Sequence, residues 1–181
     1  MLTKAQAEKA RKRALEYYAK AGIFLTAKEK AGIEVADFGL NRLDEMGLEI
    51  VTYVNTERCC AKELVLFPWQ ICPEHRHPPV SASNPGKEET FRVRFGTLYF
   101  YTEGTPTKKP KGKIPQDKKE IFTVWNEVIL NQGEQFTLTP NTRHWFQGGK
   151  EGAVVSEFST RSLDEKDIFT DPEISRIPIY K

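Results

Sequence analysis

The spacing of hydrophobic residues changes at Gly47, and this change divides the chain into a helical part and a strand-rich part. Before this glycine, the pattern predicts a helix over residues 3–21, with alanines in its middle and tyrosines near its end. Thr3 and Gln6 have the spacing of a capping box, and Gly22 suits the position just past the helix. The chain is therefore expected to begin with a well-defined helix.

Two shorter helical segments are predicted before the strands begin. Thr26 and Glu29 form a second capping pair, which opens a helix that stops near Gly32. Residues 38–46 have a helical pattern that ends at Gly47, so a third short helix is expected there.

After Gly47 the sequence consists of short runs rich in β-branched and aromatic residues, separated by turn-forming residues. Runs at this spacing are typical of a β-sandwich or β-barrel, whereas an α/β fold would need long helical runs between them. The fold class is therefore predicted to be mainly β, with helices at the N-terminus. The predicted strands cover residues 48–54, 63–67, 89–95, 97–103, 121–130, 134–139, 143–147 and 153–160.

This division predicts an N-terminal helical segment packed on the barrel (1–47), the β-barrel itself (48–161) and a C-terminal tail (162–181). The tail is polar and rich in turns, but it ends in isoleucines and a tyrosine that can cover an open end of the barrel or a partner subunit. The connection at 104–119 carries six lysines and three prolines. It is expected to be a solvated loop, with a basic lid or phosphate clamp over a site as the alternative.

Composition and charge narrow the function classes. With 39% hydrophobic and 29% charged residues, the chain has the composition of a soluble globular protein. A net charge of +2 gives no reason to expect a nucleic acid or a membrane as partner. The start of the chain lacks the apolar run of a signal peptide or a transmembrane span. The three cysteines, Cys59, Cys60 and Cys72, do not suit a disulfide framework, which favours a cytoplasmic location.

All three histidines fall in two short motifs. His75 and His77 lie one residue apart, and residues i and i+2 of a strand face the same way, so their imidazoles are expected to point at one place. Imidazole is a good ligand for divalent first-row metals. Two neighbouring histidines can equally be a surface pair, so a metal site needs further ligands. His144, in the second motif, is the remaining histidine.

The alternation of residues 88–95 selects a carboxylate for the same site. Glu89 shares its strand face with two phenylalanines and a valine, whereas Glu88 shares its face with a threonine and two arginines. The apolar face must be the barrel interior, so Glu89 is predicted to point inward, where a cation would offset the cost of its burial. Lys87 has the same parity, either as a functional group or as a lysine that keeps its ammonium group in water.

These residues resemble the two motifs of the cupin superfamily. The first motif, H-x-H followed by a gap and E-x6-G, begins at His75, and the gap is longer than usual, which implies an extra loop. The second motif begins at Gly133 and differs from the family pattern at three turn positions. The resemblance implies a small jelly-roll β-barrel of the cupin type with one divalent metal. The ligands it implies are His75, His77, Glu89 and His144.

Longer stretches resemble the D-lyxose isomerase group of cupins and extend over most of the chain. The resemblance implies an aldose–ketose isomerase that interconverts D-lyxose and D-xylulose, with D-mannose and D-fructose as a further pair. It also implies a preference for Mn²⁺, a cytoplasmic location and a homodimer. The stretches that carry it are 54–56, 62–68, 72–79, 87–92, 144–147 and 167–172.

Aldose–ketose isomerisation moves a proton between C1 and C2, so it needs an acid and a base that lie inside the barrel without being metal ligands. Lys87 qualifies by parity. Glu157 lies in an otherwise apolar or small strand, where the alternative is an edge-strand charge that deters aggregation. Glu157 is predicted to shuttle the proton and Lys87 to polarise or protonate a substrate oxygen, although the two roles can be exchanged. The further predictions are Lys62, Glu63 and Arg161 as sugar contacts. Trp69 and Trp145 can wall the pocket, although a position in the core is the more common outcome for a tryptophan.

Three other functions remain open from the sequence, because a fold does not fix a reaction. An Fe²⁺-dependent cupin dioxygenase would need no obligatory proton shuttle. A non-enzymatic sugar-binding cupin would keep its function without Lys87 and Glu157. A phosphosugar isomerase would use the lysine-rich connection at 104–119 as a phosphate clamp.

Overall fold

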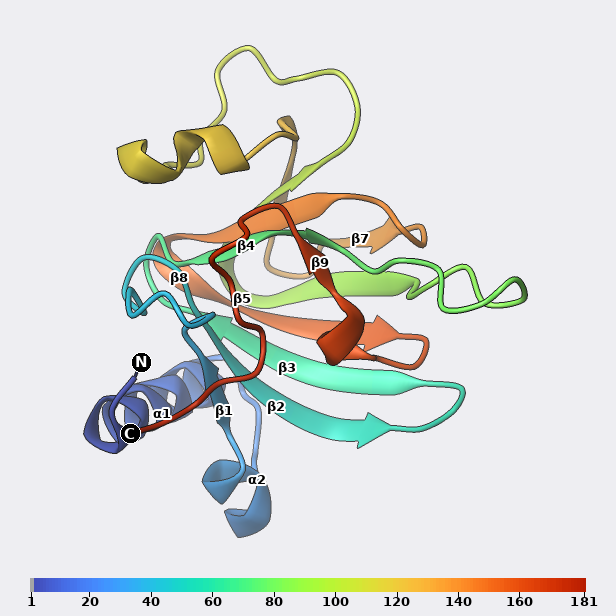
Figure 1. Cartoon of the computed structure of the whole chain (residues 1–181). Coiled ribbons are helices and arrows are strands. Elements are labelled where there is room, and N and C mark those ends of the chain that lie inside the picture. Colours follow the sequence, from blue (N-terminus) through green and yellow to red (C-terminus); the bar gives the residue numbers. More distant parts are fainter. Residues whose placement is uncertain (1) are drawn as a thin grey trace.

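Two long antiparallel strands, β5 (Glu89–Thr102) and β8 (His144–Ser159), form the centre of the computed structural model, which describes residues 2–181 (Figure 1). β8 also pairs with β3 and β4, and β5 also pairs with β6 and β7, so the nine strands form one curled antiparallel sheet. The predicted mainly β class with N-terminal helices is confirmed. The remaining elements are α1 (Lys4–Lys20), α2 (Ala27–Ala31), β1 (Glu34–Ala36), β2 (Leu48–Asn55), β3 (Cys60–Leu66), β4 (Ile71–Arg76), β6 (Asn126–Asn131), β7 (Gln135–Leu138), β9 (Ile168–Phe169) and the 3₁₀ helices Gln116–Ile121 and Asp164–Lys166.

The inner face of the curled sheet is apolar, and its aromatic residues lie beside the second histidine motif. Phe91, Phe100 and Phe146 pack against one another with ring centroids 5.1–5.9 Å apart. Phe100 also stacks on His144 at 5.6 Å. Burial of each such side chain contributes roughly 1.5–3 kcal/mol, so this cluster gives the histidine a rigid support.

Both helices predicted from capping boxes are confirmed. α1 packs its alanines and tyrosines on the outer face of the sheet, against valines of β2, β3 and β8. Tyr18, near the end of α1, donates its hydroxyl hydrogen toward the backbone carbonyls of Glu49 and Glu63, at 3.3 and 3.0 Å. Neither α-helix within residues 2–181 is both long and apolar enough to span a bilayer.

The third predicted helix, over residues 38–46, is wrong. Phe38, Gly39 and Asn41 have positive φ angles of 54°, 75° and 55°, and residues in this left-handed region interrupt a right-handed helix. The segment forms turns that bury Phe38 in the barrel core. Just before it, β1 pairs with β2, so the N-terminal part predicted to be helical (1–47) also contributes a strand to the sheet.

The strand breaks predicted at Gly96 and at residues 148–152 are wrong, because β5 and β8 continue through them. Gly96 and Gly152 have φ angles of 74° and 80°, and the register of the pair shifts beside Gly96. A Cβ atom on Gly96 would lie 2.1 Å from the carbonyl oxygen of Gly152. The glycines therefore bend the paired strands at a close approach instead of ending them.

The strand predicted at 121–130 is confirmed only in its second half, which is β6. Its first half is held by a carboxylate instead of a neighbouring strand. Glu74, in β4, accepts hydrogen bonds from the backbone N–H groups of Thr123 and Val124, at 2.6 and 3.0 Å. A side chain 49 residues earlier thus replaces the ladder partner that the β-rich sequence suggests.

The lysine-rich connection extends beyond the curled sheet, at the top of Figure 1. Ile114 of this connection, with Ile121 and Phe122 just after it, belongs to a cluster that contains Trp145 and Tyr101. Lys118 forms an ion pair with Asp171 at 2.8 Å. No residue of 104–119 lines the metal-site pocket described below, in keeping with the predicted surface loop.

The C-terminal tail runs across the barrel and returns to α1, where the two termini lie together (Figure 1). β9 pairs with β4, and Arg176 forms ion pairs with Glu34 at 2.5 Å and Asp164 at 2.7 Å. The backbone of Lys181 donates a hydrogen bond to the carbonyl of Leu2. Of the apolar residues at the end of the tail, Ile174 packs on the barrel core and Tyr180 packs on the cluster beneath α1, whereas Ile177 and Ile179 are exposed.

Glu49 generates a prediction about stability. It is fully buried beneath α1, and burial raises its pKa well above the usual value. The unfolded chain ionises this group near pH 4. The contribution of the protonated Glu49 side chain to the free energy of unfolding is therefore fully present below about pH 4 and is lost as the pH rises. In thermal unfolding, we expect the Tm of Glu49→Gln relative to wild type to increase between about pH 4 and about pH 8. The increase is expected to be roughly 2–4 °C for each kcal/mol of stability that wild type loses over this range.

The control is Glu88→Gln, because Glu88 is exposed. Its Tm difference from wild type is expected to stay flat over the same range. A flat difference for Glu49→Gln would contradict the assignment of a raised pKa to this carboxyl group.

Candidate metal centre and active site

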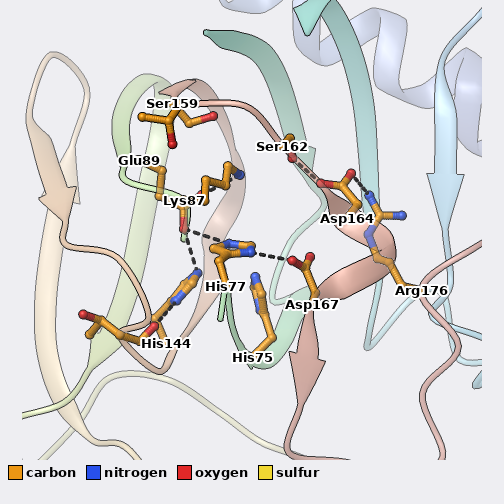
Figure 2. A network of polar contacts seen from close by, with 12 residues as sticks. His75, His77, Lys87, Glu89, His144, Ser159, Ser162, Asp164, Asp167 and Arg176 are labelled. Carbon is orange, nitrogen blue, oxygen red and sulfur yellow. Dashed lines mark hydrogen bonds and ion pairs between the residues drawn. The ribbon is translucent and has the colours of Figure 1, made fainter. Parts of the chain in front are cut away.

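Three histidines from distant parts of the chain lie together inside the barrel. His75 is in β4, His77 follows directly after this strand, and His144 opens β8. The strand register pairs His75 with His144. One ligand atom from each ring lies within 4.8 Å of the others, and all three side chains are buried. Figure 2 shows the rings gathered at one place, so this group can hold a metal ion.

Backbone carbonyls fix the tautomer of two of these rings. Nδ1 of His75 and Nδ1 of His144 lie 2.8 and 3.0 Å from the carbonyl oxygen two residues earlier in each case. A carbonyl only accepts hydrogen bonds, so Nδ1 carries the hydrogen in both rings. The Nε2 atoms of the neutral rings then keep their lone pairs, which is the state that binds a metal.

The site contains buried polar atoms that lack hydrogen bonds. Nε2 of His77 and Nε2 of His144 lie 3.0 and 3.2 Å from Oε1 of Glu89. None of these three atoms has a hydrogen-bond partner within residues 2–181. The Nε2 lone pair of neutral His144 and the carboxylate oxygen of Glu89 repel one another unless a positive charge lies between them. The donor set therefore fits a cation, and Glu89 points inward as the strand alternation predicts.

Burial and nearby carboxylates set the protonation of the histidines. Burial lowers the pKa of His144 to about 4, and it holds the pKa of His75 well below the usual value. Burial also opposes protonation of His77, but the carboxylates of Glu89 and Asp167 outweigh it and raise this pKa to about 9. His75 and His144 are therefore neutral at pH 7, as metal ligands must be, whereas His77 is protonated and would lose its Nε2 proton when a metal binds.

Lys87 places a positive charge between two carboxylates beside the histidines. Its Nζ atom lies 2.7 Å from Oε2 of Glu89 and 2.5 Å from Oε1 of Glu157. All three side chains are buried. Burial opposes the charge of Lys87, but the two carboxylates outweigh it and keep its pKa well above the usual value. Lys87 is therefore an ammonium ion at neutral pH, and both it and Glu157 lie inside the barrel as predicted.

These groups form the polar part of a pocket whose other walls are largely apolar. β2, β3, β5 and β8 supply aliphatic and phenylalanine side chains, and the C-terminal tail supplies two carboxylates, a phenylalanine and an arginine. An apolar cavity with a few converging polar groups is typical of a small-molecule site. The lining residues are Phe38, Leu48, Ile50, Lys62, Leu64, Cys72, His75, His77, Lys87, Glu89, Phe91, Phe146, Glu157, Asp164, Asp167, Phe169 and Arg176.

Comparison with known families and proteins identifies what kind of site this is. The model of the D-lyxose isomerase family matches residues 16–180. The chain belongs to this family. It is 60% identical to a D-lyxose ketol-isomerase of Thermofilum sp. and 56% identical to a D-lyxose/D-mannose isomerase of Thermosediminibacter oceani, over 98% of both chains in each case. It is 54% identical to a D-lyxose ketol-isomerase of Cohnella laeviribosi, over 95% of this chain and 94% of that one.

Solved structures confirm the cupin-like fold of this D-lyxose isomerase family member. L-ribose isomerase of Acinetobacter sp. DL28, in complex with L-ribose, superposes with a TM-score of 0.80 over 96% of this chain and 94% of that one. The L-ribose isomerase of Cellulomonas parahominis superposes with a TM-score of 0.79 over 95% and 94%. Their sequences are only 16% and 15% identical to this chain, so the likeness concerns the fold.

The predicted sugar contacts occupy different positions in this family member. Lys62 lines the pocket, and its Nζ atom forms an ion pair with Asp164 at 2.9 Å. Arg161 is exposed and paired with Glu57, and it lies in a small neighbouring pocket that reaches His77. Glu63 is buried on the outer side of β3, beneath α1, and does not line the metal-site pocket. The structure thus brings Lys62 to the histidines' pocket, but not Arg161 or Glu63.

Neither tryptophan lines that pocket, and Trp145 takes the core position that is the more common outcome for this residue. Trp145 is fully buried and stacks on Tyr101 with ring centroids 3.8 Å apart. Trp69 stacks on Tyr99 at 6.0 Å, next to the lysine-rich connection. Phenylalanines of β5, β8 and the tail form the aromatic walls instead.

Three charged pocket residues were missed by reasoning from the sequence, and all lie in the tail: Asp164, Asp167 and Arg176. The only signal was that 167–172 is one of the stretches that resemble the D-lyxose isomerase group. No strand alternation or motif spacing points to the other two. Their position depends on how the tail folds back on the barrel.

The unpaired ligand atoms generate a prediction about metal binding. A ligand that binds only the folded state stabilises it by about 2.7 kcal/mol at a concentration of 100 times its Kd. We therefore expect added Mn²⁺ to raise the Tm of the chelator-treated protein, and His144→Ala to lose most of this rise because a buried ligand is gone. Thermal unfolding with and without Mn²⁺ measures the difference within each variant.

Arg76 provides the matched control, because it lies between the two neighbouring histidines and contacts Asn141 instead of the pocket. Arg76→Ala is expected to keep the full Mn²⁺-dependent rise. An unchanged rise in His144→Ala would show that the ion binds elsewhere.

Proposed function

We propose that this protein is a metal-dependent aldose–ketose isomerase that interconverts D-lyxose and D-xylulose. The observation that carries the proposal is the buried ammonium group of Lys87, held between Glu89 and Glu157 beside three histidines. This arrangement offers a cation site and a proton-transfer pair in one pocket. Relatives named as D-lyxose ketol-isomerases, 54–60% identical over nearly the whole chain, support the choice of substrate.

The reaction moves one hydrogen from C2 of the aldose to C1 of the ketose through an enediol, with a matching proton transfer between the two oxygens. A divalent metal held by His75, His77, Glu89 and His144 would polarise the substrate oxygens and offset the negative charge of the enediolate. The protein must then supply a base for the carbon-bound proton and a donor for the oxygen. Both have to lie inside the pocket without being ligands.

The charge state of Lys87 divides the two roles. Because the pKa of Lys87 is held well above its usual value, its amine has no lone pair available at neutral pH. Lys87 therefore donates hydrogen bonds to a substrate oxygen. Glu157, whose Oε1 atom contacts Lys87, is the base that takes the proton at one carbon and returns it at the other.

Several finer features follow from the resemblance to the D-lyxose isomerase group. D-Mannose and D-fructose are proposed as a second substrate pair, supported by the D-lyxose/D-mannose isomerase from Thermosediminibacter oceani. Mn²⁺ is proposed as the metal because of this resemblance, and a set of imidazoles and one carboxylate accepts it along with the other first-row divalent ions. A homodimer in the cytoplasm is proposed as the working state, and light scattering on the purified protein tests the dimer.

An anaerobic assay tests the reaction itself. Purified protein with Mn²⁺ and D-lyxose is expected to produce D-xylulose, and D-xylulose formed in deuterium oxide is expected to carry deuterium at C1 if the base exchanges with solvent. D-Mannose and phosphorylated pentoses serve as comparison substrates. Oxygen consumption with Fe²⁺, together with no ketose from any pentose or hexose, would sink the isomerase proposal in favour of a dioxygenase.

Glu157→Gln tests the proton shuttle. The amide keeps the size and the hydrogen bond of the carboxylate but cannot accept the carbon-bound proton, so kcat is expected to fall by about 10²–10⁴-fold while Mn²⁺ binding is retained. Steady-state kinetics and a metal titration on the same protein separate these effects. Glu88→Gln, on the exposed face of the same barrel, is the control and should keep full turnover. Full turnover in Glu157→Gln would refute the assignment of the base.

A further inference from the structure

The three histidines of the metal centre differ in what holds their rings. His75 and His144 each point Nδ1 at a backbone carbonyl two residues away, so their orientation comes with their own strands. His77 instead points Nδ1 at Oδ1 of Asp167, at 2.5 Å and 90 residues later in the chain. The orientation of this one ring therefore depends on the C-terminal tail. Figure 2 shows Asp167 on the side of His77 opposite Glu89.

His77 also has less support from its own strand than the other two. β4 ends at Arg76, so His77 lies outside the ladder in which His75 and His144 are paired. Two prolines follow it, and they have no N–H group to donate. Nδ1 is thus the point at which the ring can be fixed, and the contact is buried, with 8% and 7% of the two side chains exposed.

The tail holds Asp167 from both sides. On one side, Asp164 is bound by Lys62 at 2.9 Å and by Arg176 at 2.7 Å. On the other side, β9 pairs with β4, and Phe169 stacks on His75 at 5.2 Å. Asp167 is therefore presented to His77 by a short segment that is anchored at each end, which we call the strap (residues 162–170).

We propose that Asp167 is a positioning residue that fixes the ring of His77 and thereby makes metal retention depend on the strap. A carboxylate that accepts the Nδ1 hydrogen orients the ring and increases the basicity of Nε2, the ligand atom. Because coupling between two sites is reciprocal, metal binding must in turn stabilise the strap in its closed position. This inference rests on the metal-binding part of the proposed function and extends it to residues that are not ligands.

The variants that test this role separate the effect of the charge of Asp167, the effect of its hydrogen bond and the effect of a loosened tail. Asp167→Asn keeps an acceptor oxygen but removes the negative charge, and Asp167→Ala removes both. Asp171→Asn is the matched control, because Asp171 is also a buried tail carboxylate but pairs with Lys118 instead of a histidine. Mn²⁺ affinity of each full-length protein is measured by competition with a fluorescent chelator.

We expect Asp167→Ala to weaken Mn²⁺ binding by about 10–100-fold, Asp167→Asn to lie between it and wild type, and Asp171→Asn to match wild type. Equal affinities for Asp167→Ala and wild type would overturn the proposal. So would an equal loss in Asp167→Ala and Asp171→Asn, because this would reflect a loosened tail and not a positioned ring. Absence of Mn²⁺ binding in wild type would overturn both this inference and the proposed metal site.

Hydrogen exchange tests the reciprocal effect without any sugar. The amide of Thr170, which donates to the carbonyl of Glu74, reports on closure of the strap. We expect Mn²⁺ to slow exchange in residues 164–170 of wild type by a factor similar to the affinity lost in Asp167→Ala, and to have little effect in that variant. Exchange that is unaffected by Mn²⁺ in wild type would overturn the coupling. A wild type that binds Mn²⁺ but makes no ketose would refute the proposed reaction and leave this inference standing.

Discussion

A carboxylate buried in an apolar barrel is the constraint on which the rest of the site depends. Glu89 is 1% exposed and shares the inner face of its strand with phenylalanines. An ionised group is costly in such a position unless positive charge lies close to it. One of its oxygens meets that requirement through Lys87 at 2.7 Å. The other faces the ring nitrogens of His77 and His144 and has no hydrogen-bond partner within the described chain. The ammonium group of Lys87 at one oxygen, and a cation bound between the rings at the other, would both offset the negative charge of Glu89.

The pairing of β8 with both β4 and β5 brings these charges together. It sets His144 opposite His75 on one side and Thr102 on the other, and at its far end it sets Glu157 opposite Phe91. A continuous β5 and a continuous β8 are required for one strand pair to carry both His144 and Glu157, the carboxylate proposed as the proton shuttle. The glycines that look like turns in the sequence therefore serve the site, because they let the strands bend without ending.

Features that depend on local periodicity were accessible from the sequence. Alternation along residues 88–95 distinguishes Glu89 from Glu88, because it depends only on the geometry of a single strand. The i, i+2 spacing likewise places His75 and His77 near one point, although β4 ends before His77 and the ring of His77 is oriented by Asp167. The capping boxes of the two helices are equally local. The left-handed turns at 38–41 were missed because Phe38 has no intrinsic preference for a positive φ angle.

Features that depend on long-range hydrogen bonds were not accessible. Glu74 takes the place of a strand partner for Thr123, and no sequence pattern in either segment predicts this contact. The same holds for Asp167 and His77. In each case a hydrogen bond to a carboxylate, and not backbone pairing, fixes the position of a segment or ring. The spacing of hydrophobic residues does not indicate such a contact. The resemblance of 167–172 to the family was the one signal in the tail, and it carried no physical role.

One of these two carboxylates, Glu74, lies in β4, and the other, Asp167, contacts His77 just after β4. Their combined effect explains why the tail belongs to the site. Glu74 also accepts a hydrogen bond from the side chain of Thr170, at 2.7 Å, three residues after Asp167. The carboxylate that fixes the segment around Thr123 thus fixes the far end of the strap as well. A barrel with a small interior gains a closed polar pocket in this way, because a tail bound by charge at Arg176 and by hydrogen bonds at Thr170 supplies the wall that the sheet alone lacks.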